Sequence, residues 1–441
     1  RRCLSCKSMK RDLAIDATRG VAIWSMITAH FAHESVLATP THAFPYVDGM
    51  SAFVMLSGVV LGLVYQRWVA RHGLAFAYKR LAKRIVVLYL CQLAIALVAV
   101  AAALAGHRWL TLLLPVDGWG DGLRLALTMD YLPSGGNILL LYMVLLISAF
   151  GLFPLLRQGW WRWVLAGSIA LYLISLVHSP DWFYLSAYQA APHIQNVAGW
   201  QIMFVPALVI GWNWSQWRVP EFVDRWIIAI VAVALAVALF FHFGIDYGPW
   251  AHLEPAVADK LDFRPARAIG AYLAIPAVYG IFRLLLRRWH HDWLRPLVMT
   301  GTRSLDSYVI QAIALVVVPI HIAHRPWNTV TMDAVALLVF AACWGWAEFR
   351  YFAHVDKLHK LPLRMVRLVR PHRPDIVPGP EPGVPTPESS DAPREPRPVV
   401  DDLRGVDRTG TAGDGPERDG PIGAGTRPAG TCATEPMGVH P

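Results

Sequence analysis

Long apolar stretches alternate with short polar connections over most of the chain. Each stretch is roughly 18 to 22 residues long, which is the length that a helix needs to cross the hydrocarbon core of a bilayer. The stretches lie at 13–33, 50–68, 84–105, 138–156, 162–178, 199–217, 226–243, 267–286, 304–322 and 330–352. We therefore expect an all-α fold, a polytopic membrane helical bundle of about ten transmembrane helices.

The composition supports a membrane protein and sets the C-terminal part of the chain apart. Of the 441 residues, 55% are hydrophobic and 16% are charged, whereas about 25% are charged in a typical soluble domain. From Pro374 onward there is no aromatic residue, and 25 of 68 residues are Pro or Gly. Such a segment cannot bury enough apolar surface to offset its conformational entropy, so we expect a disordered tail. The predicted organisation is an N-terminal extension at 1–9, a transmembrane domain at 10–365, and a basic juxtamembrane segment with the disordered cytoplasmic tail at 366–441.

Lys and Arg concentrate in alternate connections, which predicts an orientation. They follow the second segment at 67–84, the eighth at 283–295 and the tenth at 350–370. Because cytoplasmic loops carry an excess of Lys and Arg, we expect a multi-pass protein of the cell membrane with both termini in the cytoplasm. The net charge of +9 is then a topology signal. Nucleic-acid binding is disfavoured, because the basic groups line membrane edges rather than a folded soluble face.

Three ionisable residues, Asp16, Arg19 and His30, interrupt the first apolar segment. Ionisable groups in hydrocarbon are expensive and normally face a protein interior or a water-filled cavity. At about 100° per residue, Arg19 and His30 differ by ~20° around a helix, and Asp16 lies within ~60° of both. One helix face thus carries an acid, a guanidinium and an imidazole, which favours chemistry or transport within the membrane. We expect this face to line a hydrated passage shared with the third segment, at 84–105.

Each of these residues also has a purely structural interpretation. His30 could cap the end of its helix, and Asp16 and Arg19 could form an ion pair that fixes helix packing. The ion-pair interpretation is weakened by the position of Arg19 inside the apolar run, where a cation is costly unless a cavity or an anion receives it. A catalytic interpretation of His30 is that it takes a proton from a hydroxyl at neutral pH and returns it to a leaving group.

A second basic pair, Arg80 and Arg84, stands at the start of the third segment. Four residues apart, the two side chains share one helix face. Guanidinium groups bind phosphate or carboxylate through two parallel hydrogen bonds, so the pair is a candidate anion site. Anchoring at the cytoplasmic membrane edge explains the same pattern without a ligand.

Other patterns narrow the chemistry. The sequence contains no P-loop, no dinucleotide-binding glycine motif, no GxSxG and no HExxH, so ATP, nicotinamide and zinc mechanisms lack support. Cys3 and Cys6 form a lone CxxC pair without partner ligands, and we predict no metal site. The predicted external connections at 106–136 and 178–198 combine aromatic rings with carboxylates, which suits either sugar binding or an interfacial aromatic belt. Asn196 and Gln201 are interpreted as helix caps or interhelical hydrogen-bonding groups.

An ordered set of short motifs resembles the OpgC-type proteins of the acyltransferase 3 superfamily. The resemblance covers about 10–325, nearly all of the predicted membrane domain. The motifs are Arg11–Gly20 continuing to His30, Phe53–Tyr65, the helix with Arg80 and Arg84, Leu139–Tyr142, Trp200–Phe204, Asp259–Leu261 with Arg264, and Gly301–Leu305. The Pro- and Gly-rich tail and the insertion Ser134–Gly136 depart from the family pattern.

The resemblance implies a membrane-embedded O-acyltransferase. Such an enzyme moves an acyl group, expected to be succinyl, from cytoplasmic acyl-CoA to a hydroxyl of an extracytoplasmic, cell-envelope glycan. The family roles map onto His30 near the acceptor and onto Arg80 and Arg84 at the donor. In the resulting hypothesis, Arg80 and Arg84 hold the CoA phosphates, Asp16 and Arg19 line the channel, and His30 acts as the base. Asn196, Gln201 and Ser57 are alternative groups for stabilising the oxyanion.

Two other classes of function stay open from the sequence. In a transporter or flippase, the same buried charges would form a substrate or proton path. In a membrane scaffold without catalysis, the predicted cytoplasmic tail would recruit a partner.

Overall fold

The computed structural model describes residues 12–32, 35–42, 44–107, 113, 115–133, 136–186, 194–246, 248–288, 291–318 and 328–353. The predicted extension at 1–9, with Cys3 and Cys6, and the predicted tail at 366–441 lie outside these ranges. The division of the chain into three parts therefore stays a prediction.

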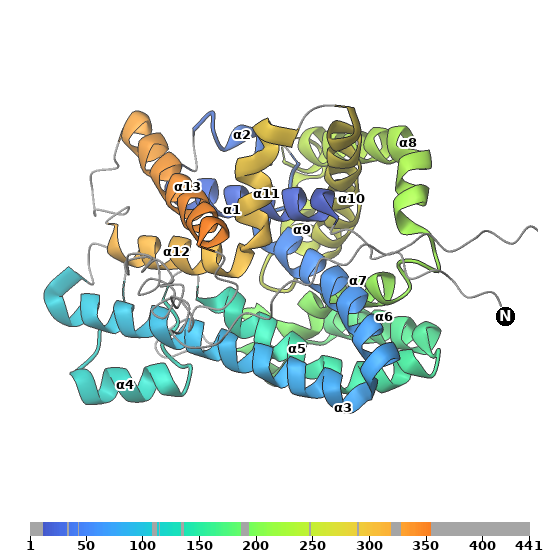
Figure 1. Cartoon of the computed structure of the whole chain (residues 1–441). Coiled ribbons are helices and arrows are strands. Elements are labelled where there is room, and N and C mark those ends of the chain that lie inside the picture. The colour runs from blue at the N-terminus through green and yellow to red at the C-terminus, as the bar shows by residue number, and fades with distance from the viewer. Residues whose placement is uncertain are drawn as a thin grey trace, which may run out of the picture. The chain divides into compact units, whose positions relative to one another are not determined.

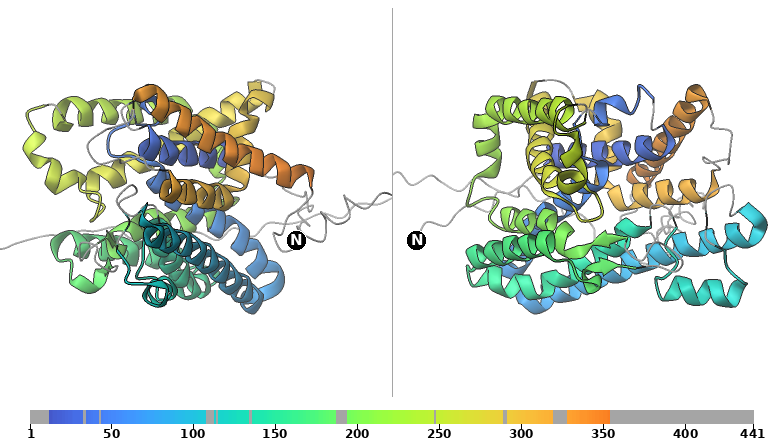
Figure 2. Two further views of the ribbon diagram at one scale, coloured as in Figure 1. Left: turned by 90° about the vertical axis from the view of Figure 1, so that its left-hand side faces the viewer. Right: turned by 180° about the vertical axis from the view of Figure 1, so that it is seen from behind.

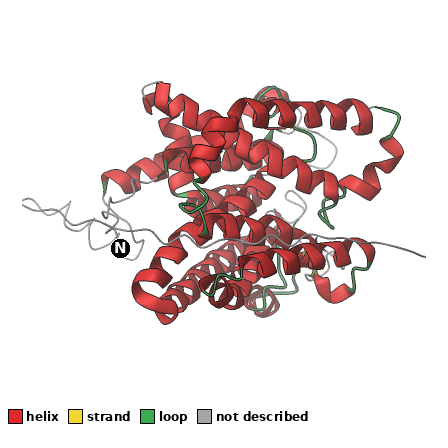
Figure 3. Cartoon of the chain, turned by 90° about the vertical axis from the view of Figure 1, so that its right-hand side faces the viewer, coloured by secondary structure: helices red, strands yellow, loops and turns green. Residues whose placement is uncertain are grey.

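Helices make up almost all of the described structure (Figure 3). They are α1 (Leu13–Phe31), α2 (Thr39–His42), α3 (Gly49–Ala102), α4 (Trp119–Leu127), α5 (Asn137–Arg157), α6 (Trp161–Val177), α7 (Val197–Trp212), α8 (Val219–Phe240), α9 (Glu254–Ala258), α10 (Pro265–Arg288), α11 (Arg295–Thr302), α12 (Ser304–Val317) and α13 (Thr329–Phe352), labelled in Figure 1. Short helical turns of other types lie at Ala103–His107, Asp181–Phe183, Phe241–Asp246, Ala251–Leu253 and His291–Leu294. The two strands, β1 (Tyr184–Leu185) and β2 (Gln195–Asn196), pair antiparallel.

Five helical stretches of the described chain are long and apolar enough to cross a membrane. They span 49–106, 137–157, 219–245, 265–288 and 329–352. Three shorter apolar helices, α6, α7 and α12, accompany them. The predicted all-α membrane fold is thus confirmed, while the number of ten transmembrane helices stays a prediction.

The predicted second and third segments belong to one helix, α3. The apolar pattern predicts a connection between 68 and 84, and the structure has a kink at Gly73 in this range that joins two helical stretches without a loop. No proline interrupts this stretch, and the backbone breaks only at Gly73, whose φ of 82° is left-handed. Glycine adopts this value without steric cost, so a single helix can change direction here (Figure 1).

Glycines allow helix backbones to approach closely at two crossings. A Cβ added to Gly62 of α3 would lie 2.2 Å from the Leu208 oxygen of α7. A Cβ added to Gly301 of α11 would lie 1.8 Å from the Asp16 oxygen of α1. Small residues serve this purpose in membrane proteins, where helices gain little from hydrophobic burial against one another. The second crossing fixes the depth at which α1 carries Asp16.

Helix α1 lies in the interior of the described structure. It contacts α3, α10, α11, α12 and α13, and both views of Figure 2 show it surrounded by other helices. Most of its residues are buried, including the polar Asp16, Thr18 and Ser25. These three polar side chains are therefore enclosed by protein, whereas Arg19 and His30 are half-buried.

Candidate functional site

The first half of α1 presents two of the predicted site residues to the protein interior. The Asp12 carboxylate caps the helix by accepting a hydrogen bond from the Ala14 N–H, 3.0 Å away. Asp16 follows one turn later and is 3% exposed. The Arg19 guanidinium donates a hydrogen bond to the Ser304 hydroxyl at the start of α12. We call the end of the bundle where α1 begins the Asp12 end, and the opposite one the His30 end.

A cavity of about 940 Å³ opens at the Asp12 end, and we call it the charged cavity. Its walls come from the start of α1, residues 60–67 of α3, the α7–α8 connection and the end of α10. Its charged lining residues are Asp12, Asp16, Arg19, Arg67, Glu221, Arg283 and Arg287. A volume in the range of about 300–1,000 Å³ is typical of small-molecule and cofactor sites. Four arginines in one such space suit an anionic ligand.

One wall of the charged cavity is held by an arginine–aspartate network between α8 and α10. The Arg283 Nε and Nη2 atoms donate to the two Asp224 carboxylate oxygens over 2.8 and 2.7 Å. Arg287 donates to the same carboxylate, and the Tyr279 hydroxyl donates to Asp12 over 2.8 Å. Asp224 therefore fixes both guanidinium groups by charge-assisted hydrogen bonds.

Arg287 has donors left over for a ligand. Its guanidinium uses one nitrogen on Asp224, and its side chain is 57% exposed. A guanidinium carries five N–H donors in a planar fork, so most of them remain available at the cavity. A bound phosphate or carboxylate could accept these donors at the Asp12 end.

The structure brings Asp16 and Arg19 into one cavity but keeps His30 away from it. His30 is half-buried in the last turn of α1 and does not line the charged cavity. Eleven residues separate Arg19 from His30, which is about 16 Å along a helix. The expected passage is also shared with a different helix segment, because the cavity is lined by residues 60–67 of α3 rather than by 84–105.

Arg80 and Arg84 lie outside the charged cavity, beyond the break in α3. The exposed Arg80 guanidinium stacks over the rings of Trp68 and Phe76, 5.7 and 5.0 Å from their centroids. Arg84 donates a hydrogen bond to the Tyr142 hydroxyl of α5. Since Trp68 directly follows Arg67, Arg80 is near the cavity mouth although it does not line it.

Three arginines that line the charged cavity were assigned from the sequence only to membrane anchoring. They are Arg67, Arg283 and Arg287. They come from two segments more than 200 residues apart in sequence, and nothing in the local pattern places them together. The available signal is that each lies at the end of an apolar segment that the orientation rule puts on the side of Asp12. That signal gives a side of the membrane but no shared cavity.

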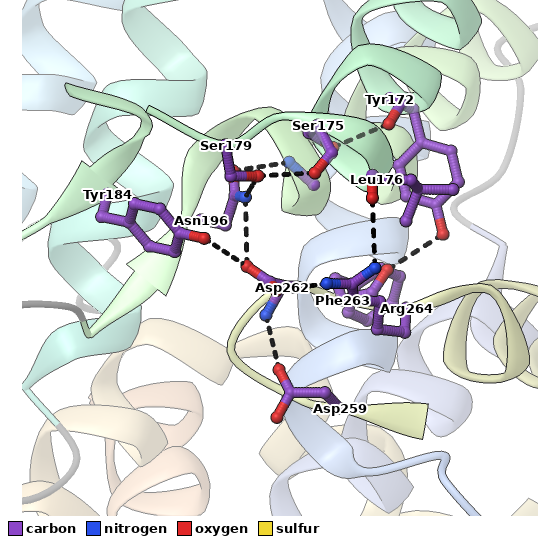
Figure 4. Close-up of polar contacts among 11 residues, drawn as sticks. Tyr172, Ser175, Leu176, Ser179, Tyr184, Asn196, Asp259, Asp262, Phe263 and Arg264 are labelled. Atoms are coloured by element: carbon purple, nitrogen blue, oxygen red, sulfur yellow. Dashed lines mark hydrogen bonds and ion pairs between the residues drawn. The ribbon is translucent and has the colours of Figure 1, made fainter. Parts of the chain in front are cut away.

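A second polar group at the His30 end surrounds Asp262, in the connection before α10. We call Asp262, Tyr184, Asn196, Ser179 and Arg264 the Asp262 cluster (Figure 4). The Tyr184 hydroxyl donates to Asp262 over 2.6 Å, and Arg264 donates over 3.0 Å. The Asn196 amide donates to Asp262 over 3.3 Å and to the Ser179 hydroxyl over 2.9 Å. Partial burial and the hydrogen bond to Asp262 raise the pKa of the Tyr184 phenol, so it remains a donor at neutral pH.

The connection that carries Asp262 is held in a strained conformation. Phe263 has a φ of 53°, in the left-handed region that non-glycine residues rarely adopt. Its buried ring packs on Trp200 with centroids 4.3 Å apart, and its carbonyl accepts a hydrogen bond from Tyr172. These contacts hold the strained residue in place. The motif residues Trp200, Asp259 and Arg264 thus meet around one loop.

The three groups considered for oxyanion stabilisation differ in how they are bonded. The Asn196 side chain caps α7 by accepting from the Gly199 N–H over 3.0 Å. The Gln201 amide bonds both the hydroxyl and the carbonyl of Ser168 in α6, which confirms its interhelical role. Ser57 is fully buried, and its hydroxyl has no hydrogen-bond partner among the described residues.

Fold and site together define a helical membrane protein with a buried aspartate and a half-buried arginine at a large arginine-lined cavity. The family model described as OpgC protein matches residues 11–352. The chain therefore belongs to the OpgC protein family, which confirms the resemblance noted in the sequence. No match was found among curated proteins or among solved structures.

Proposed function

We propose that this protein is an acyltransferase that takes its acyl group from acyl-CoA bound at the charged cavity. The acceptor is a hydroxyl of a cell-envelope glycan at the outer face of the membrane, and the family resemblance favours succinyl as the acyl group. The observation that carries the proposal is the convergence of Arg19, Arg67, Arg283 and Arg287 on one cavity. CoA carries several phosphate charges, and guanidinium groups are the side chains best suited to bind them.

The proposal assigns the Asp12 end to the cytoplasm, following the distribution of Lys and Arg. Arg67 and Arg287 bind phosphates at the mouth, and Arg80, beside Trp68, extends this basic surface. Arg84, which donates a hydrogen bond to the Tyr142 hydroxyl, is a further candidate for binding acyl-CoA. The pantetheine arm then runs along α1 past Asp16 and Arg19 toward His30, which lies about 16 Å beyond Arg19.

The chemical step belongs to the His30 end. His30 removes the proton from a sugar hydroxyl as that oxygen attacks the thioester carbonyl. The carbon–sulfur bond breaks when the tetrahedral intermediate collapses, and the proton on His30 passes to the leaving CoA thiolate. The products are a glycan ester and free CoA. Asp16 and Arg19 fix the charge environment of the channel through which the thioester arrives.

Replacing His30 tests this step. His30→Ala is expected to lower the rate of labelled acyl transfer to glycan by about 10²- to 10⁴-fold, as for loss of a general base. Binding of acyl-CoA should persist, because His30 lies outside the charged cavity. His72→Ala, at an exposed histidine of α3, is the matched control. Near-normal transfer by the His30→Ala protein in nanodiscs would remove His30 from the mechanism.

A transporter or flippase is the second candidate, because buried ionisable residues that line a cavity also suit a substrate path. The buried Asp16 and the half-buried Arg19, which both line the charged cavity, provide that observation here. The two functions differ in their products. Mass spectrometry of reconstituted vesicles should find new glycan esters if the protein is a transferase, and unmodified cargo on the far side if it is a transporter.

A further inference from the structure

A second cavity, of about 290 Å³, lies along the same helices nearer the His30 end, and we call it the outer cavity. Residues 18–25 of α1, 231–238 of α8 and 274–278 of α10 contribute to its walls, together with the connection before α3. The charged cavity uses residues 12–19, 220–221 and 283–287 of the same three helices. The two cavities have no lining residue in common among those described.

The lining of the outer cavity is mostly apolar, and its polar side chains are Thr18, Ser25, Thr41 and Asp48. Its aliphatic lining residues include Val231, Ala234, Ala274 and Val278. Among the described lining residues there is no Lys or Arg. Its one ionisable lining residue, Asp48, pairs with Lys260 over 2.6 Å. A phosphate or a free carboxylate would find no unshared cation here, and its burial would be costly.

The outer cavity reaches the apolar outer face of α8. Leu235 lines the cavity and is also 57% exposed. Its neighbours Ile228 and Leu239 are exposed as well, on a helix long and apolar enough to cross a membrane. In a bilayer the exposed side chains of this helix would face hydrocarbon, so Leu235 places one wall of the cavity at a lipid-facing surface.

A mostly apolar cavity of this kind holds water poorly, because the greater part of its wall offers water no polar partner. Left empty, it loses the dispersion contacts that its walls would make with a filling group. Ser25 adds the one buried hydroxyl on this lining that has no hydrogen-bond partner in the described structure. It could donate to an ester oxygen.

We infer that the outer cavity binds a hydrocarbon chain of a membrane lipid, which enters beside Leu235. The polar end of the lipid lies toward Asp48 and Lys260, and the chain runs between α1, α8 and α10 toward Thr18. The acyl group of the donor is the less favoured occupant, because it would have to enter from a separate cavity. The inference does not depend on the proposed acyl transfer.

Photolabelling in nanodiscs tests the inference without any transferase activity. A phosphatidylcholine with a diazirine near the chain terminus should label residues 231–238 and 274–278 more than the exposed face of α13 at Leu338. Ala234→Phe fills the cavity and should lower the labelling of 274–278 several-fold. Ala236→Phe, on the exposed face of the same helix, is the matched control and should leave it unchanged. If Ala234→Phe does not fold, Ala238→Leu replaces it.

Two outcomes overturn the inference. Labelling spread evenly over α8 and α13, and unaffected by a filling variant, would mean that the chain only covers the outer surface. Preferential labelling of 274–278 by a diazirine acyl-CoA instead of the phospholipid would make the outer cavity a donor subsite. Loss of acyl transfer activity alone is not a test of this inference, because it corresponds to neither of these two labelling outcomes.

Discussion

The charged cavity and the Asp262 cluster both bring arginine, aspartate and tyrosine side chains together, but the two arrangements serve different purposes. Each contains an arginine–aspartate pair beside a tyrosine, namely Arg283, Asp224 and Tyr279 in the first. In the Asp262 cluster, tyrosine, asparagine and arginine donors converge on one carboxylate and hold a strained loop in place. At the charged cavity, which has a volume of about 940 Å³, Asp224 holds the lining residues Arg283 and Arg287, and Arg287 keeps donors for a ligand among the described residues. Free volume and surplus donors, more than residue identity, separate a binding site from a structural clamp.

The largest effect on stability is expected in the Asp262 cluster. Asp262→Ala removes the acceptor of three hydrogen bonds, one of them from Arg264. We expect the free energy of unfolding to fall by about 2 to 3 kcal/mol, because hydrogen bonds to a charged group are lost and the partly buried Arg264 guanidinium keeps only the Leu176 carbonyl of its two hydrogen-bond acceptors among the described residues. Denaturant unfolding in detergent measures the loss, with Glu254→Ala, at an exposed carboxylate, as the control. Acyl-CoA affinity should not change, and a weakened affinity would show that the cluster does more than hold the loop.

A smaller effect is expected at the charged cavity, on the affinity for acyl-CoA rather than on stability. Asp224→Ala frees Arg283 and Arg287 from the carboxylate that orients them. We expect acyl-CoA to bind about tenfold more weakly, equivalent to about 1.4 kcal/mol, because the donors lose their fixed geometry. Fluorescence titration with a labelled acyl-CoA measures this change. Unaltered affinity together with lost stability would make the Asp224 network a clamp like the other cluster.

The sequence predicts the class of fold and part of the candidate site for physical reasons that are local. Apolar runs of bilayer length identify the helices, and the cost of an ion in hydrocarbon places Asp16 and Arg19 inside. Both are consequences of short-range patterns, and the structure buries Asp16 and brings both residues to one cavity.

Features that depend on contacts distant in sequence could not be predicted in this way. The meeting of Arg67 with Arg283 and Arg287 follows from how α3 packs beside α10, which no local pattern encodes. The kink that joins the two helical stretches of α3 within 68–84 depends on Gly73 taking a left-handed backbone angle. The conformation of Phe263 depends on a pocket formed by Trp200 of α7. Of these residues only Trp200 belongs to a recognised motif, and a motif gives an order along the chain but no arrangement in space.

The central claim is that the charged cavity binds the anionic acyl donor, and donor affinity tests it most directly. The measurement is binding of labelled acyl-CoA to the purified protein in nanodiscs, comparing Arg287→Ala with Arg225→Ala. Arg225 is exposed on α8, one residue from Asp224, and does not line the cavity. We predict that Arg287→Ala weakens binding by about 10- to 100-fold, as for loss of a hydrogen bond between charged groups, and that Arg225→Ala leaves it unchanged. Equal affinity in the unsubstituted, Arg287→Ala and Arg67→Ala proteins would contradict the claim.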